Sequence, residues 1–245
     1  MKYLRYILAL ALVSGCVGHP ADDEEDGPVG PVTPPTEEVS AGLVMDFTAT
    51  WCVNCPRMTS AIEELMNETK GNIYPVCIHF RDDFSTNETE AIAADFNVQS
   101  YPSVVVNLDK SSLVTTTSKS LILAKLKEAT KANKAPCVIE ASAQDGKLSV
   151  EVTATDVGTY ALGALLLENG VTAAQTGSTE DYVHNDILRK VLSASLAGED
   201  LGTLNSGESI KKEFSFEITP GKDYHILTYV TDGGLVNAVE KITLL

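Results

Sequence analysis

The most informative part of this 245-residue chain is the stretch Met45-Asp46-Phe47-Thr48-Ala49-Thr50-Trp51-Cys52-Val53-Asn54-Cys55-Pro56. It begins in a short apolar run, residues 43–47, of the kind that forms a buried strand. It leads into a segment whose apolar residues recur at helical spacing. These residues are Met58, Ala61, Ile62, Leu65 and Met66. Two cysteines separated by two residues therefore lie between a predicted strand and a predicted helix.

This position favours thiol chemistry at Cys52 and Cys55. Free N–H groups and the helix dipole at the start of a helix stabilise a thiolate, so we expect Cys52 to be the nucleophile. Cys55 is close enough in sequence to resolve a mixed disulfide formed by Cys52. Pro56 is compatible with the first helical turn, where its missing N–H costs no hydrogen bond. Zinc is the alternative, but it needs two more ligands, and the sequence has no second close pair of cysteines or histidines. We therefore predict no metal and no cofactor.

Residues 45–52 are similar to the active-site strand and turn of the thioredoxin superfamily. Asp46 stands six residues before Cys52, which matches the buried acid of that superfamily. The resemblance implies that Asp46 is a catalytic residue that exchanges a proton with Cys55. A buried carboxyl with a raised pKa suits that role, and the place of Asp46 in an apolar strand favours burial.

A second segment, residues 95–103, resembles the part of the thioredoxin superfamily that carries its cis-proline. The resemblance implies a cis bond before Pro102 and a substrate-binding surface at Trp51, Tyr101 and Pro102. The chain also departs from thioredoxin. Val53-Asn54 replaces Gly-Pro between the cysteines, and extra residues, which we assign to the polar stretch 81–89, separate the cysteines from Pro102.

The pattern along the chain predicts two domains. From 41 to 135, strands at 43–47, 73–80, 104–106 and 113–114 alternate with amphipathic segments that predict helices at 58–66, 87–96 and 122–129, an α/β pattern. Asn87 and Glu90 are the expected helix start, and Asp109 and Lys110 the expected strand turn. From 136 to 245 the chain predicts short strands at 148–154, 160–167, 210–218, 224–230 and 236–242, which favours an antiparallel β-sandwich of the immunoglobulin-like kind.

The N-terminus predicts export and lipid attachment. Residues 1–15 combine Lys2 and Arg5 with an apolar run too short to span a membrane. Val13-Ser14-Gly15-Cys16 resembles the lipobox of bacterial lipoproteins, which implies lipid on Cys16 and anchoring to the membrane through it. The alternative is an ordinary secretory signal with a chance cysteine. Residues 16–40 are acidic and proline-rich, as in a stalk; they also resemble Bacteroidota surface-export signals, and a plain spacer is the alternative.

The whole chain resembles the Bacteroidota lipoproteins related to the twenty-eight-kilodalton outer-membrane protein, and residues 182–189 support this. Its net charge of −16 repels phosphate, so we predict no nucleic-acid binding. Cys77 is expected to be an inert core thiol, although a bond to Cys137 is left open.

We predict an envelope thiol–disulfide oxidoreductase, an outer-membrane lipoprotein that faces the periplasm or the surface. Its partners are exported proteins bearing thiols or disulfides. The alternatives are a surface binding or adhesion lipoprotein whose disulfide is structural or vestigial, and a chaperone-like use of the same cleft.

Overall fold

The computed structural model describes residues 41–130, 136–178 and 182–244. The predicted signal peptide, the stalk and the lipidation site Cys16 lie outside the described residues, as does the predicted boundary at 135. Within the described residues, no helix is long and apolar enough to cross a membrane.

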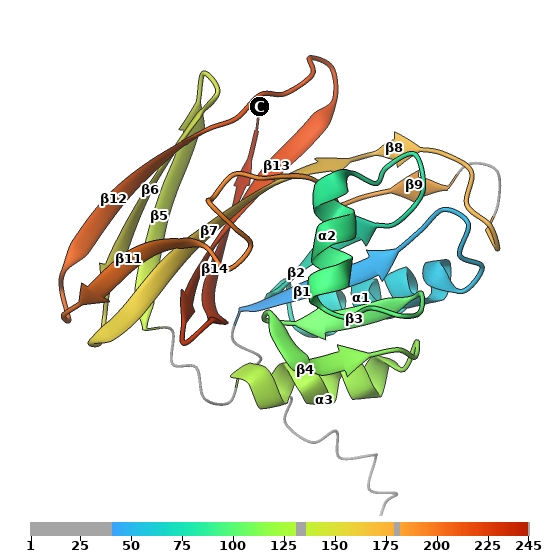
Figure 1. The fold of residues 1–245 in the computed structure, drawn as a ribbon, viewed down its shortest axis with the longest axis horizontal. Coiled ribbons are helices and arrows are strands. Elements are labelled where there is room, and N and C mark those ends of the chain that lie inside the picture. Colours follow the sequence, from blue (N-terminus) through green and yellow to red (C-terminus); the bar gives the residue numbers. More distant parts are fainter. Residues whose placement is uncertain (1–40, 131–135, 179–181, 245) are drawn as a thin grey trace, which may run out of the picture. The chain divides into compact units, whose positions relative to one another are not determined.

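The first half of the chain has the predicted order of strands and helices (Figure 1). Its elements are β1 (Gly42–Thr48), α1 (Cys55–Glu68), β2 (Ile73–His79), α2 (Asn87–Asp95), β3 (Ser103–Val106), β4 (Asp109–Val114) and α3 (Lys119–Thr130). Strand β1 is buried along its whole length because helices cover both faces of the sheet around it. Helices α1 and α3 pack on one face through Met58, Ile62 and Leu126, and α2 packs on the other through Ile92 and Phe96.

Two local details in this half differ from the prediction. Helix α2 begins at Asn87, as predicted, but its capping box is formed by Thr86, which exchanges hydrogen bonds with Thr89, and not by Asn87 with Glu90. The turn between β3 and β4 is made by Asn107 and Leu108, both at positive φ, and not by Asp109 and Lys110. Asn107 suits this turn because asparagine tolerates the left-handed region, and its buried Oδ1 accepts the N–H of Leu43.

The second half is rich in strands and has no helix among its described residues. Its strands are β5 (Cys137–Gln144), β6 (Lys147–Ala154), β7 (Gly158–Asn169), β8 (Val171–Thr172), β9 (Val183–His184), β10 (Ile187–Val191), β11 (Glu199–Leu204), β12 (Ser209–Ser215), β13 (Asp223–Asp232) and β14 (Leu235–Thr243). Strands β12, β6 and β5 form one antiparallel sheet. The alternating apolar residues of β6 pack against those of β7 and β13, so two sheets enclose one core.

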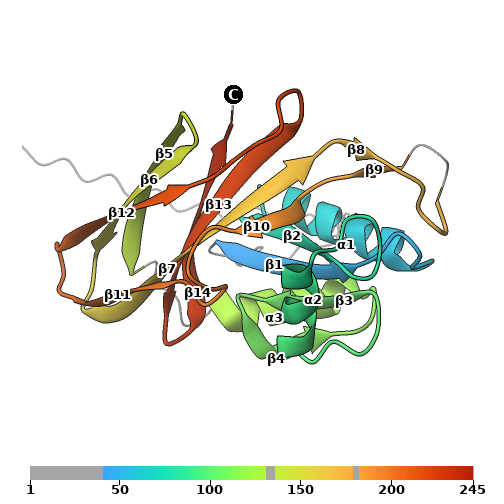
Figure 2. The ribbon, with the colours of Figure 1, turned by 45° about the horizontal axis from the view of Figure 1, so that its top comes forward.

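A single sheet runs through both halves of the chain. Its strand order is β14-β13-β7-β10-β2-β1-β3-β4, with β11 also paired to β7. The junction is parallel pairing of β10 with β2, where the N–H of Cys77 donates to the carbonyl of Asp186 at 2.8 Å. Figures 1 and 2 show β7 and β13 extending from the sandwich towards this junction. Residues 38–245 accordingly form one compact unit, although the architecture changes after α3.

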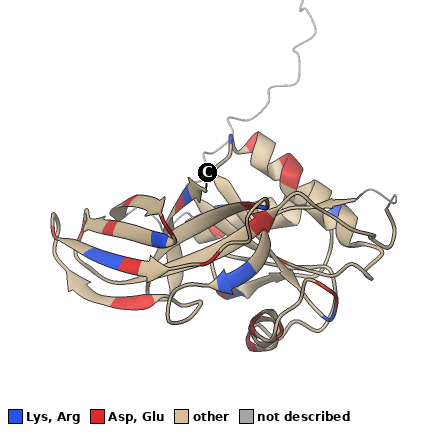
Figure 3. Ribbon diagram, turned by 90° about the horizontal axis from the view of Figure 1, so that it is seen from above, with Lys and Arg blue, Asp and Glu red and all other residues tan. Residues whose placement is uncertain are grey.

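Acidic and basic residues stand beside one another on the strands of the second half (Figure 3). Lys211 pairs with Glu151 at 3.0 Å and Lys212 with Glu199 at 2.7 Å. The buried Glu168 on β7 forms ion pairs with Arg189 of β10, at 2.6 Å, and with Lys222, at 2.9 Å. Arg189 and Lys222 therefore neutralise a buried carboxylate of the same chain.

Candidate active site

Cys52 and Cys55 form a disulfide, with their Cα atoms 5.4 Å apart. Helix α1 begins at Cys55, so Cys52 lies in the turn that precedes the helix rather than in its first turn. Pro56 occupies the start of the helix, as predicted. Both cysteines are largely covered: Cys52 is 4% exposed and Cys55 is 1% exposed. Of the two residues, Cys52 has the slightly larger exposed fraction.

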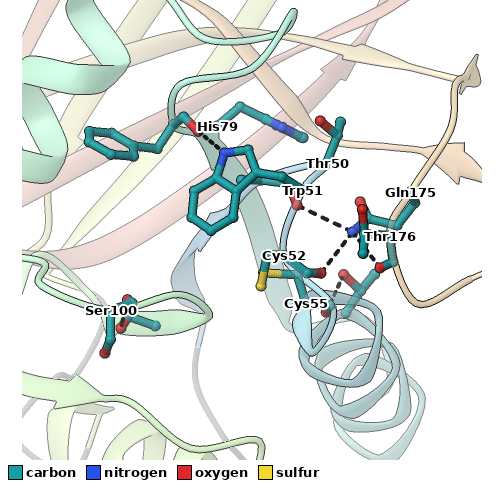
Figure 4. Close-up of a disulfide and its surroundings, with 12 residues drawn as sticks. Thr50, Trp51, Cys52, Cys55, His79, Ser100, Gln175 and Thr176 are labelled. Atoms are coloured by element: carbon teal, nitrogen blue, oxygen red, sulfur yellow. Dashed lines mark hydrogen bonds between the residues drawn. A yellow bond between two sulfur atoms is a disulfide. The ribbon is translucent and has the colours of Figure 1, made fainter.

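The turn that carries Cys52 is held from the side of β2. The backbone N–H of Thr50 donates to Oδ2 of Asp82 at 2.8 Å. The indole Nε1 of Trp51 donates to the carbonyls of Phe80 and Arg81 at 3.1 and 3.2 Å (Figure 4). These bonds fix the backbone immediately before the disulfide.

Asp82 is a site residue that the sequence interpretation did not include. Besides Thr50, its carboxylate contacts Nδ1 of His79 at 2.7 Å and accepts the N–H groups of Phe84 and Ser85. Burial acts to raise the pKa of Asp82, but the hydrogen bond and charge of His79 and the backbone N–H groups lower it overall. The signal for this role was the extra polar stretch 81–89, which supplies Asp82.

An aromatic surface borders the disulfide. Tyr101 packs against Ala49 and the two cysteines, and the peptide bond between Tyr101 and Pro102 is cis. The ring of Tyr101 stacks on Phe80 at 5.0 Å and meets the edge of Trp51 at 5.6 Å. Trp51 is 48% exposed, which is high for an aromatic side chain. Trp51 and the partly buried Tyr101 thus lie together beside the disulfide, Pro102 is buried next to Tyr101, and Trp51 offers a partner exposed apolar surface.

A cavity of about 370 Å³ lies behind the disulfide. From the first half it is lined by Asp46, Cys55 and Cys77. The second half contributes Gln175, Tyr182, His184, Asp186 and Lys241, among others. The β-rich region therefore takes part in enclosing the site.

Asp46 is buried, as predicted, with 1% of its surface exposed. Neither carboxylate oxygen has a hydrogen-bond partner. Burial without a partner raises the pKa of Asp46 to about 7, because the charged form loses its hydration. A carboxyl with that pKa, in the cavity that Cys55 also lines, can accept or release a proton at neutral pH.

Burial also shifts the pKa of three further groups that line the cavity, Asp186, His184 and Cys77. Burial raises the pKa of Asp186 to about 6, against the opposing effect of Lys241. Burial lowers the pKa of His184 to about 4, so its imidazole is neutral at pH 7, and its Nε2 has no hydrogen-bond partner. Burial and the nearby Asp46 raise the pKa of Cys77 well above its usual range. Cys77 and Cys137 are both free thiols, so they do not pair with each other.

The segment that follows β8 contacts the disulfide turn from the second half of the chain. Gln175 is 6% exposed, and its Nε2 donates to the carbonyls of Ala49 and Cys52 at 3.2 and 2.9 Å (Figure 4). The N–H of Thr176 donates to the carbonyl of Thr50 at 2.8 Å. These contacts join residues more than 120 positions apart, and no local pattern in the sequence signals them.

Three of the residue groups predicted from the sequence therefore meet: the Cys52–Cys55 pair, the buried Asp46 and the Trp51–Tyr101–Pro102 surface. In the described part of the chain, no group of three or more His, Cys, Asp or Glu side chains is placed to hold a metal ion.

Comparison with known families agrees with this architecture. The model of the outer membrane protein Omp28 family matches residues 89–244. The chain belongs to the Omp28 family. The thioredoxin family model matches residues 36–132, so the two matches overlap across α2, β3, β4 and α3. The Omp28 match thus includes the strands of the shared sheet other than β1 and β2, and the family name indicates an outer-membrane or envelope protein. A search of curated protein sequences finds no match.

Two solved structures share the fold of this Omp28-family chain over most of its length. HBP35 of Porphyromonas gingivalis aligns with a TM-score of 0.67 and 21% identity, covering 84% of this chain and 76% of the other. Protein AGR_C_4864 from Agrobacterium tumefaciens aligns with a TM-score of 0.61 and 12% identity, covering 84% and 95%. At these identities the likeness concerns the fold: a thioredoxin-like α/β part followed by a β-rich part.

Proposed function

We propose that this protein is an envelope thiol–disulfide oxidoreductase that exchanges disulfides with exported proteins. The observation that carries the proposal is the cavity that Asp46 and Cys55 line together, directly behind the disulfide. The buried, unpartnered carboxyl of Asp46, with its pKa near 7, lowers the stability of the folded chain at neutral pH. Proton exchange with the Cys55 thiol is a function that accounts for such a residue. The exposed ring of Trp51, packed on the partly buried Tyr101 beside the disulfide, supports an extended polypeptide as the partner.

The exchange balances without a cofactor. In the reduced protein the Cys52 thiolate attacks a sulfur of the partner's disulfide, and one partner thiolate leaves and takes a proton. Cys55 gives its proton to the Asp46 carboxylate and attacks Sγ of Cys52, which releases the second partner thiolate. The partner disulfide gains two electrons, and the Cys52–Cys55 disulfide forms. The reverse sequence oxidises a partner dithiol, with protonated Asp46 as the proton donor to Cys55.

In this proposal the protein acts at the envelope, held by lipid on Cys16 as an outer-membrane lipoprotein that faces the periplasm or the surface. The Omp28 family membership supports that location. Exported proteins are the partners, since disulfides persist outside the cytosol.

Replacing Cys55 by serine tests the exchange. The reduced Cys55→Ser protein, incubated with an oxidised envelope extract, should accumulate mixed disulfides at Cys52 that a reductant releases. The matched control is the double variant Cys52→Ser/Cys55→Ser, which should accumulate none at these positions.

A second candidate, a binding or adhesion lipoprotein with a structural disulfide, is favoured by the low exposure of both cysteines. If Cys55→Ser traps no more protein than the double variant, that second function replaces the first.

A further inference from the structure

The segment Ala173–Ser178, which follows β8, lies against the redox turn although it belongs to the β-rich half of the chain. Strands β8 and β9 pair at Val171–His184 and Thr172–Val183, and the N–H of Ala173 donates to the carbonyl of Tyr182. This short hairpin carries the segment to the disulfide turn (Figure 1). Burial of a glutamine side chain in this segment would cost free energy unless its amide were hydrogen-bonded.

Gln175 binds the backbone that presents Cys52. Its amide nitrogen reaches the carbonyl of Cys52, the reacting residue, and the carbonyl of Ala49 at the start of the turn. With the bond from Thr176 to Thr50, three carbonyls within four residues of chain are held from this side. On the opposite side, Asp82 and the Phe80–Arg81 backbone hold Thr50 and Trp51. The redox turn is thus held between the two halves.

Gly177 makes this close approach possible. A Cβ at position 177 would lie 2.4 Å from the carbonyl oxygen of Val53, and the backbone φ of +86° is one that side chains rarely adopt. Val53 lies between the two cysteines. The contact therefore depends on glycine at this position, for both steric and conformational reasons.

The sulfur of Cys52 points away from this segment. In Figure 4 it faces Ser100, beside the Tyr101–Pro102 bond, whereas Gln175 and Thr176 lie on the other side of the turn. The segment thus closes one side of the dithiol and leaves the aromatic side accessible. We propose that Gln175 is a positioning residue of the redox site, through which the β-rich region fixes the Cys52 turn and restricts a partner to the Tyr101–Pro102 side. This inference rests on the proposed exchange function and gives the β-rich region a part in it.

Two substitutions of Gln175 test its role, one that removes its hydrogen bonds and one that also introduces a negative charge. Gln175→Met keeps the length of the side chain but removes both donors, so Cys52 is held less firmly near Cys55. We expect the equilibrium of the pair in a dithiol buffer to shift towards the reduced form by about threefold to tenfold. Gln175→Glu has the same shape, faces the carbonyls with an acceptor and adds a negative charge beside Cys52. Where this carboxyl is ionised, we expect its charge to disfavour the Cys52 thiolate and to slow alkylation of Cys52 by about tenfold.

Both quantities are measured on the full chain, with the rate of Cys52 alkylation followed in the reduced protein across a pH series. Gln144→Met and Gln144→Glu, at an exposed position on β5, are the matched controls and should leave both quantities unchanged. Gly177→Ala disturbs the same contact by a different route and should shift the redox equilibrium in the direction of Gln175→Met. A circular-dichroism melt of each variant identifies any that fail to fold.

The outcomes distinguish the two proposals. If the wild-type pair exchanges and both Gln175 variants behave like their Gln144 controls, the role of Gln175 is overturned while the exchange function stands. If the wild-type protein itself shows no reactive thiol and traps no partner, the exchange function is overturned, and the role of Gln175 with it.

Discussion

Asp46 and Cys77 lie directly opposite each other on the neighbouring parallel strands β1 and β2. Both side chains line the cavity that Cys55 also lines. Burial and the negative charge of an ionised Asp46 both oppose ionisation of the Cys77 thiol. The structure therefore places an unreactive thiol next to the pair that is able to react.

Cys77 should resist alkylation in the folded protein. At pH 7 we expect iodoacetamide to leave both the partly exposed Cys77 and the buried Cys137 largely unmodified, because the raised pKa of each thiol keeps it protonated. After unfolding in guanidinium both should react completely. Mapping of the labelled peptides by mass spectrometry separates these sites from Cys16. Fast labelling of Cys77 in the native state at pH 7 would contradict the raised pKa of its thiol.

Asp46→Asn should change the pH dependence of stability. Between pH 3.8 and about 7 the folded chain holds a proton that the unfolded chain has released, so the free energy of unfolding falls as pH rises through this window. Between pH 4 and pH 8 we expect the wild type to lose up to about 4 kcal/mol relative to Asp46→Asn. Urea unfolding of both oxidised proteins at the two pH values measures this difference. Equal pH profiles would contradict a raised pKa. Thiol exchange of the variant should also slow, because its amide accepts no proton from Cys55.

Asp82→Ala should loosen the redox turn. The substitution leaves the N–H of Thr50 and the ring of His79 without their acceptor, which we expect to cost about 1–3 kcal/mol of unfolding free energy at pH 7. Because the folded pKa of Asp82 is lowered, its contribution is present above pH 3.8 and is lost as the pH falls through the folded pKa. Asp83→Ala, at the exposed neighbouring position, is the control and should have little effect. Similar losses in the two variants would refute the assignment.

Gly163→Ala should destabilise the β-rich half. A Cβ at Gly163 would meet the ring of Tyr229 at 2.1 Å, and Tyr229 is fully buried between β7 and β14. We expect a loss of about 1–3 kcal/mol from overpacking. Tyr229→Leu removes the ring, so the double variant should lose clearly less than the sum of the two single changes. Additive losses, measured by chemical unfolding, would show that the ring and Gly163 do not interact.

Sequence predicted the α/β half well because its signals are local. The apolar run of β1, the helical spacing after Cys55 and the segment before Pro102 each depend on a few consecutive residues. The burial of Asp46 followed from its place in β1. The capping residue of α2 and the turn between β3 and β4 were predicted one or two positions away from where they lie. Several neighbouring polar residues are suited to each of these positions.

The β-rich half was harder to predict. Strands β5, β8, β9, β10 and β11 were not predicted. The exposed face of β5 and the short length of β8, β9 and β10 give weak alternation. The joining of β10 to β2, and the approach of Gln175 to Cys52, depend on pairing between residues far apart in the chain. The resemblance to a known family supplied the general architecture, but the contacts across the junction were found only in three dimensions.

The parallel pairing of β2 with β10 has a consequence for any fragment of this protein. A piece that ended after α3 would uncover the hydrogen-bonding edge of β2 together with the apolar side chains on α2 that Leu188 and Val191 now cover. Bare strand edges of this kind recruit other strands, so the isolated redox half should self-associate when produced alone. We therefore expect the two halves to fold as one unit and not as independent domains.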